Sequence, residues 1–347
     1  MSRRVLVVGP SWVGDMVMAH AAVQVLTGRG NRVDILAPGW SLPVIQRMPG
    51  VARGIELAAG HGQLKLGTRR AVARDLKAAG YAQAIVLPRS LKAALVPFFA
   101  RIPVRTGFLG EHRYGLINDR RPFAADVLDQ TVKRFVALAL NRDEALPASL
   151  PAPVLVPDET ARRETAARLG LGDDANPVAL MPGAEYGPSK CWPHPHYRAL
   201  ADALQAEGHA VWVFGSDRDR AAAAAIVGGQ ARNLAGATSL AEAVDLMSLC
   251  RVAVTNDSGL MHVAAALGCH VIALYGSSSP AFTPPLSARS TVRWLGLDCS
   301  PCFERDCPLG HHRCLRDIAP DSVLADVRSA LAALVGAASS RDQPPST

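Results

Sequence analysis

The sequence predicts an α/β protein with two Rossmann-like domains, each built on a doubly wound parallel sheet. Short apolar runs of strand length alternate with segments of helical pattern, which is typical of parallel βαβ units. The alternation occurs in two series, separated by the proline-rich segment 145–158. The length of 347 residues also suits two domains. We expect the domains to face each other across a cleft, with ligands beyond the carboxyl ends of the strands.

The first series spans residues 1–150 and contains unbroken apolar runs. The expected strands are residues 4–10, 33–38 and 82–88, and the expected helices include residues 18–26 and 70–80. Runs of this kind are typical of strands that are buried on both faces.

A linker and a second series follow. The prolines of segment 145–158 do not fit inside a helix or a central strand, so this segment is the expected linker. The second domain is expected over 151–337, with strands at 177–184, 209–216, 251–257 and 270–276 and helices at 196–208, 239–250, 259–268 and 322–336. Residues 338–347 are expected to form a disordered tail.

The composition narrows the function class. The formal net charge of +7 and the pI near 9.2 favour either an anionic partner or solubility alone. No apolar run reaches the length of a membrane span, and the N-terminus lacks a signal-peptide pattern, so we expect a cytoplasmic protein. A nucleic-acid-binding protein is the alternative from another class. Scattered basic residues and few aromatic ones argue against it.

A polar loop, GPSWVGD, follows the first strand at residues 9–15. It lacks the GxGxxG pattern of a dinucleotide site. Its acid, Asp15, has two interpretations: a helix cap, or a general base that takes a proton from an incoming hydroxyl. We take Asp15 as the candidate catalytic residue.

The second domain carries polar groups after three of its strands. Lys190 follows a Gly/Pro-rich loop, where an ammonium can neutralise a diphosphate, although a surface lysine is the common alternative. Asp217 follows the next strand, and we prefer ribose binding to a metal role for it. In NDSGLMH, Asn256 or Asp257 can cap a helix whose first N–H groups face a phosphate. His262 lies one turn further on, either facing the same ligand or buried against a backbone carbonyl.

Four cysteines cluster near the C-terminus with the spacing C-x₂-C-x₄-C-x₆-C, beside two histidines. Thiols this closely spaced suit a structural Zn²⁺ ion or an iron–sulfur cluster. Free thiols and a redox-labile disulfide are the alternatives. The candidate ligands are Cys299, Cys302, Cys307 and Cys314.

Long motifs over nearly the whole chain resemble the heptosyltransferases of glycosyltransferase family 9, above all the type II members. They include GPSWVGDMVM, PGAEYGPSKCWPHPHY, VFGSDRD and NDSGLMHVAAALG. The resemblance implies a GT-B fold and an inverting transfer of L-glycero-D-manno-heptose from ADP-heptose to the first heptose of the lipopolysaccharide inner core. Type I or III members, which use other core acceptors, remain the alternative.

The resemblance also implies roles for single residues. Asp15 would be the base and Lys190 would hold the diphosphate. The implied donor-site residues are Ser11, Lys190, Asp217, Thr238, Asp257, Ser258, Gly259 and His262. For the acceptor we expect Arg89, Lys92 and Arg113, each of which can equally be a solvated charge.

The remaining implications concern partners and location. The expected partners are ADP-heptose and a heptosyl-Kdo-lipid A acceptor, with no nucleic acid. Transfer is expected to require no cofactor, and the protein to sit peripherally on the cytoplasmic face of the inner membrane.

Overall fold

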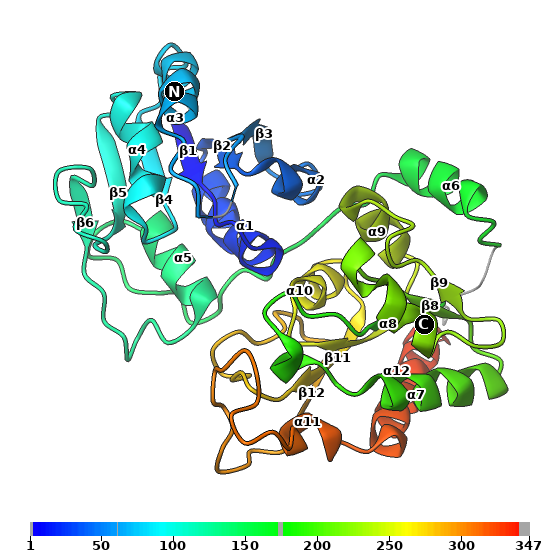
Figure 1. The fold of residues 1–347 in the computed structure, drawn as a ribbon. Helices are drawn as coiled ribbons and strands as arrows, with labels where there is room; N and C mark the ends of the chain where they lie inside the picture. The colour runs from blue at the N-terminus through cyan, green and yellow to red at the C-terminus, as the bar shows by residue number, and fades with distance from the viewer. Residues whose placement is uncertain (1–2, 61, 173–175, 340–347) are drawn as a thin grey trace, which may run out of the picture. The chain divides into compact units, whose positions relative to one another are not determined.

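The structure is a computed structural model that describes residues 3–60, 62–172 and 176–339 (Figure 1). The chain divides into two compact units, Met1–Val156 and Pro157–Thr347. Each unit holds a six-stranded sheet in which every described strand pair is parallel. This confirms the predicted fold class. The division falls within segment 145–158, which forms neither helix nor strand, and later than the predicted border at 150/151.

The sheet of the first unit has the strand order β3-β2-β1-β4-β5-β6. The winding direction reverses between β1 and β4, so this is a doubly wound sheet whose switch point lies between those strands. The strands are β1 Arg4–Val8, β2 Arg32–Ala37, β3 Val51–Glu56, β4 Gln83–Val86, β5 Val104–Phe108 and β6 Asp119–Arg121.

Helices cover both faces of this first sheet. On one face α3 and α4 pack on a buried apolar cluster that includes Leu6 and Val86, while α1 packs against α5. The helical elements are α1 Val13–Gly28, η1 Gly39–Ser41, α2 Leu42–Ile45, α3 Leu66–Lys77, α4 Leu91–Phe99 and α5 Thr131–Ala139. Burial from two sides explains why β1 and β4 read as unbroken apolar runs.

The second unit repeats this topology, with the order β12-β11-β10-β7-β8-β9. Its switch point lies between β7 and β10. The strands are β7 Val178–Met181, β8 Val211–Val213, β9 Arg232–Asn233, β10 Val252–Asn256, β11 His270–Tyr275 and β12 Ser290–Trp294. The helical elements are α6 Glu159–Arg168, η2 Pro188–Lys190, α7 His194–Ala206, η3 Asp217–Asp219, α8 Arg220–Ile226, α9 Leu240–Met247, α10 Gly259–Ala266, α11 Arg313–Arg316 and α12 Pro320–Ser339.

The core of the second unit lies between the sheet and helices α7, α8 and α12. Trp192 and Tyr197 are fully buried there, with ring centroids 4.8 Å apart in an edge-on arrangement. Helix α12 runs through Ser339, so residues 338 and 339 are helical and not part of the predicted disordered tail. The rest of that prediction, residues 340–347, lies outside the described ranges. Among the described helices, none combines the length and the apolar character needed to cross a membrane.

Candidate functional site

Polar groups gather at the switch point of the second sheet. Strands β7 and β10 are neighbours there, and the segments after them carry Lys190 and Asp257. The carboxyl ends of parallel strands share one edge of a sheet, and ligands of doubly wound sheets bind at the edge beside the switch point. The structure therefore brings together two residues that lie far apart in the sequence.

Lys190 and Asp257 form a largely buried ion pair. The Lys190 Nζ lies 2.5 Å from the Asp257 Oδ2, and their side chains are 18% and 6% exposed. The same ammonium lies 5.1 Å from the centre of the Tyr186 ring, within the range of a cation–π contact. The lysine is thus held at the switch point and is not the solvated surface charge that was its alternative interpretation.

Asn256 fixes the loop that carries Lys190. Its Oδ1 accepts hydrogen bonds from the Trp192 N–H (3.0 Å) and the Tyr197 hydroxyl (3.1 Å). Its Nδ2 donates to the Pro182 carbonyl at 2.6 Å. The sequence interpretation offered Asn256 or Asp257 as the cap of the next helix, and this was wrong for both, because the N-cap residue of that helix is Ser258. The Asn256 side chain is used by the β7 loop, and the Asp257 carboxylate pairs with Lys190.

Helix α10 points its N-terminus at this edge. Its N-cap residue is Ser258, whose side chain does not cap the helix, although its Oγ lies 3.5 Å from the Thr255 Oγ1. Gly259 begins the helix. The first N–H groups and the positive end of the helix dipole favour an anion here.

His262 is buried next to the ion pair and carries an unsatisfied polar atom. Its Nδ1 has no hydrogen-bond partner among the described residues. The pKa of His262 is lowered from 6.5 to about 4, mainly by burial. The nearby Asp257 carboxylate raises this pKa, and the Lys190 ammonium lowers it. The imidazole is therefore neutral at pH 7. A buried ring nitrogen without a partner fits a ligand contact better than a satisfied core histidine.

The other expected donor-site residues of this unit lie after β8 and β9. Asp217 starts the 3-10 helix η3, is 83% exposed and pairs with Arg220 at 2.7 Å. The half-buried Thr238 donates to the Leu234 carbonyl at 3.2 Å. The Asp219 carboxylate of η3 packs closely against Gly183, because a Cβ at position 183 would lie 2.4 Å from the Asp219 Oδ1.

In the first unit, Ser11 and Asp15 follow β1 at that sheet's own switch point. Asp15 lies in the first turn of α1 and is half-buried. The N-cap of α1 is Trp12, so Asp15 is not the N-cap residue. The Ser11 carbonyl accepts a hydrogen bond from the Trp40 indole at 2.9 Å.

The three expected acceptor residues differ in exposure. Arg89 is exposed and stacks over the Phe123 ring at 4.7 Å, and Lys92 is half-buried. Arg113 is fully buried, and its guanidinium donates to the carbonyls of Phe108, Pro88 and Ser90. Burial lowers its pKa to about 10. The prediction that Arg113 meets an acceptor does not fit this arrangement, because its donors already serve the loops around it.

The sequence interpretation missed a basic cavity in the first unit. This open cavity measures about 540 Å³ and lies at the end of β6. It is lined by Leu109, Asn118, Arg120, Arg121, Pro122, Arg142 and Asp143. In the sequence, the adjacent Arg120 and Arg121 at the end of NDRR could have indicated this cavity.

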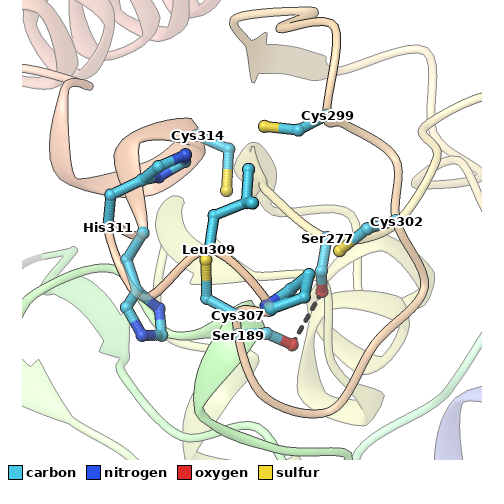
Figure 2. Close-up of a pocket in the computed structure, with 10 residues that line it drawn as sticks. Ser189, Ser277, Cys299, Cys302, Cys307, Leu309, His311 and Cys314 are labelled. Carbon is cyan, nitrogen blue, oxygen red and sulfur yellow. Dashed lines mark hydrogen bonds between the residues drawn. The ribbon is translucent and has the colours of Figure 1, made fainter.

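The four clustered cysteines surround one small cavity of about 20 Å³ in the second unit (Figure 2). All four are free and partly buried. Burial and the three neighbouring thiols raise the pKa of Cys314, which reflects their closeness. Within the described ranges, no three His, Cys, Asp or Glu side chains are already arranged to hold a metal ion.

Comparisons with known proteins show which proteins this chain is similar to. The chain is 44% identical to lipopolysaccharide heptosyltransferase 2 of Salmonella typhimurium, over 94% of this chain and 98% of that protein. It is 42% identical to lipooligosaccharide heptosyltransferase 2 of Haemophilus influenzae, over 94% and 99%. The solved structure of Escherichia coli ADP-heptose lps heptosyltransferase II matches with a TM-score of 0.85 and 41% identity, over 94% and 98% of the two chains.

The family model agrees with these relatives. The model of glycosyltransferase family 9 (heptosyltransferase) matches residues 69–313. This range covers most of the chain and includes both Lys190 and the Asp257–His262 segment. The chain belongs to glycosyltransferase family 9, the heptosyltransferases.

Proposed function

We propose that the protein transfers L-glycero-D-manno-heptose from ADP-heptose to the first heptose of the lipopolysaccharide inner core. Two groups of findings support the proposal. Relatives named heptosyltransferase 2 match almost the full chain at 40–44% identity. The observation that carries the chemistry is the Lys190–Asp257 pair at the switch point, beside the N-terminus of α10.

The donor diphosphate is proposed to bind between Lys190 and the first turn of α10. The ammonium and the N–H groups of Ser258 and Gly259 supply positive charge at one edge of the sheet. His262 is neutral there, so its free Nδ1 suits a sugar or phosphate hydrogen bond without adding charge. Asp217 and Thr238 follow β8 and β9, and we assign them to the ribose and the nucleotide. Ser11 is assigned to the donor from the first unit.

Asp15 is the proposed base. The acceptor hydroxyl gives its proton to the Asp15 carboxylate, and its oxygen forms the new bond to the anomeric carbon. The bond from that carbon to the diphosphate breaks, and the electron pair leaves with the diphosphate oxygen. Lys190 and the helix end stabilise this charge. Attack from the face opposite to ADP inverts the anomeric carbon.

These groups supply the charge stabilisation that the leaving diphosphate needs. We therefore propose that transfer itself requires no dissociable metal ion. Initial rates that stay the same with and without added Mg²⁺ are the expected result, and a rate that depends on Mg²⁺ contradicts it.

The acceptor is proposed to bind the first unit through its anionic groups. Arg89 and Lys92 are retained from the sequence, and the basic cavity adds the exposed Arg120 and Arg142, whereas Arg121 is largely buried and paired with Asp119. Guanidinium groups pair well with the carboxylates and phosphates of core sugars. Arg113 is left out, because it is buried.

The lipid-linked acceptor also suggests where the protein works. We propose peripheral contact with the cytoplasmic face of the inner membrane, supported by the net charge of +7. Co-sedimentation with anionic phosphatidylglycerol vesicles that weakens as salt rises is expected. Equal recovery with neutral phosphatidylcholine vesicles contradicts the proposal.

An acceptor panel tests the proposed reaction. ADP release from ADP-heptose is measured with three acceptors: heptose-free Kdo-lipid A, the same acceptor with one heptose, and that with two. Turnover mainly with the single-heptose acceptor is expected. Turnover only with the heptose-free acceptor assigns the protein to type I transfer, and preference for the two-heptose acceptor assigns it to type III.

A further inference from the structure

We propose that Cys299, Cys302, Cys307 and Cys314 bind one tetrahedral transition-metal ion, Zn²⁺ or Fe²⁺, which anchors the loop that supports Lys190. Figure 2 shows side chains of all four cysteines around one cavity. Three belong to the loop at residues 295–312, and Cys314 comes from α11. Four thiolates complete a tetrahedral site without another ligand.

The loop itself needs such an anchor. Residues 295–312 contain neither helix nor strand, because β12 ends at Trp294 and α11 begins at Arg313. Irregular connections longer than about 15 residues are uncommon and are usually either functional or disordered. The large apolar side chains of Phe303 and Leu309 are 53% and 62% exposed, so they bring little core burial to this loop. A metal crosslink supplies the stability that apolar packing does not.

The size of the cavity suits a single ion. Its volume of about 20 Å³ is close to the roughly 10–15 Å³ that one water molecule requires. In the present arrangement the cavity does not have room for the several atoms of an iron–sulfur cluster. The thiols are not yet at ligand geometry within the described ranges, so binding turns them about their Cα–Cβ bonds toward the cavity.

The cavity wall is shared with the loop that carries Lys190. Ser189, the neighbour of Lys190, lines the cavity together with Ser277, and their hydroxyls lie 2.9 Å apart. The Phe303 N–H donates to the Ser277 carbonyl at 2.7 Å. The cysteine loop, residues 295–312, is therefore hydrogen-bonded to Ser277, whose hydroxyl contacts the neighbour of Lys190.

Further hydrogen bonds join the two loops. The Ser189 N–H donates to the Arg305 carbonyl at 3.1 Å, and the Arg305 Nε donates to the Tyr186 carbonyl at 2.8 Å. The loops approach so closely that a Cβ at Gly187 would lie 2.5 Å from the Arg305 carbonyl oxygen. Fixing residues 303–305 thus fixes the backbone on both sides of Gly187, and with it the position of Lys190.

Two consequences follow. The full-length protein should hold about one metal ion per chain. Loss of the ion should weaken ADP binding by roughly 10-fold, an effect of the size that outer-shell partners have on the sites they support. The second consequence rests on the proposed donor site, whereas metal content does not, so the two proposals fail separately.

The test measures metal content by mass spectrometry on the purified full-length protein, after loading with Zn²⁺ alone or Fe²⁺ alone. Wild type is compared with Cys302→Ser and Cys307→Ser. The control is Cys269→Ser, because the Cys269 thiol donates to the Met247 and Cys250 carbonyls, a role that a hydroxyl keeps. Circular dichroism checks folding, and calorimetry gives the ADP affinity.

The expected result is one tightly held ion in wild type and Cys269→Ser, and loss of that ion with weaker ADP binding in the two cluster variants. Wild type with less than about 0.1 ion per chain after loading overturns the proposal. Several irons with equal sulfide overturn the single-ion assignment. Unchanged metal content in both cluster variants overturns the assignment of these ligands, and unchanged ADP affinity in metal-stripped wild type overturns the coupling to Lys190.

Discussion

At the scale of single residues, the Lys190–Asp257 pair combines a structural and a ligand-binding role. Both side chains are largely buried, so each neutralises a charge that would otherwise be costly. In the proposed function, a diphosphate gives Lys190 a second anionic partner. These two roles can be separated by mutating both residues. Without the Asp257 charge the fold no longer needs the Lys190 charge, whereas binding of a diphosphate still needs it.

Lys190→Met should cost roughly 3 kcal/mol of stability, because it leaves the buried Asp257 carboxylate unpaired. The double variant Lys190→Met/Asp257→Asn should regain most of this stability, since no charge remains buried. ADP affinity should stay at least about 10-fold weaker in both variants. Urea unfolding and calorimetry measure the two quantities. Recovery of ADP binding in the double variant contradicts the proposed diphosphate role.

His262 predicts a particular pH dependence of stability. Its pKa is about 4 in the folded protein and 6.5 as the ordinary value, so between these pH values the unfolded chain binds a proton that the folded one does not. The free energy of unfolding therefore falls as the pH drops from 6.5 to 4, by about 3 kcal/mol.

His262→Gln should lack this contribution, whereas His194→Gln, at an exposed position, should follow wild type. Urea unfolding of the three proteins between pH 7 and pH 4 makes the comparison. If the free energy of unfolding falls with pH equally in wild type and His262→Gln, the folded protein does not hold a neutral, buried imidazole.

At the scale of elements, the site depends on how one strand end holds a neighbouring loop. Asn256 ends β10, and its amide bonds to backbone on both sides of the β7 loop. The ion pair next to it joins the same two elements. The geometry around Lys190 is therefore set by the adjacency of β7 and β10, which are far apart in sequence.

Asn256→Asp should lower stability by roughly 3 kcal/mol, because the new carboxylate replaces the donor that faces the Pro182 carbonyl and is buried. Asn233→Asp is the matched control, since Asn233 is hydrogen-bonded through its Oδ1, which accepts from the Ala235 N–H, a role that a carboxylate keeps. Thermal unfolding at pH 7 measures both. Equal melting temperatures for the two variants contradict the role given to Asn256.

The sequence predicted the central strands well and the outer strands poorly. β1, β4, β7 and β10 are covered on both faces, so their burial requires unbroken apolar runs that periodicity detects. Strands such as β3 and β12 lie at sheet edges and expose much of their surface, so their sequences, VARGIE and STVRW, carry no such run. Their pairing depends on a neighbouring strand and not on their own pattern.

The candidate site was predictable where a residue directly follows a strand. Asp257 was predicted in this way, and Lys190 was predicted from the Gly/Pro-rich loop that follows β7, because strand ends mark the ligand edge of the sheet. The burial of Arg113 could not be predicted, since it depends on carbonyls at the end of β5 and in the loop between β4 and α4, which come together only in the folded chain. The contact between the cysteine loop and the Lys190 loop was equally hidden, because residues 186–189 and 303–305 meet only in the folded chain.

At the scale of the whole molecule, each unit has its own sheet and its own core. One buried core cluster of the first unit lies within residues 6–117, and one of the second unit within residues 178–334. The connecting segment is tied to the first unit, where the Val154 N–H donates to His20 and the Val156 N–H to the Arg47 carbonyl. The proposed diphosphate groups belong to the second unit alone.

A fragment of residues 157–347 should consequently fold cooperatively and bind ADP within about 10-fold of the full protein. A fragment of residues 1–156 should fold without binding ADP. Denaturant unfolding and calorimetry on each fragment give the answer. ADP binding by the first fragment, or none by a folded second fragment, contradicts the assignment of the nucleotide to the second unit.

The most direct test of the account is ADP release from ADP-heptose with the single-heptose acceptor, for wild type and Asp15→Asn, with ADP affinity measured alongside. The account predicts turnover by wild type. It also predicts a loss of at least about 100-fold in kcat for Asp15→Asn at unchanged ADP affinity, because a general base contributes about 10²–10⁴-fold. Equal turnover by Asp15→Asn would contradict the mechanism, and no turnover by wild type with any core acceptor would contradict the proposed function.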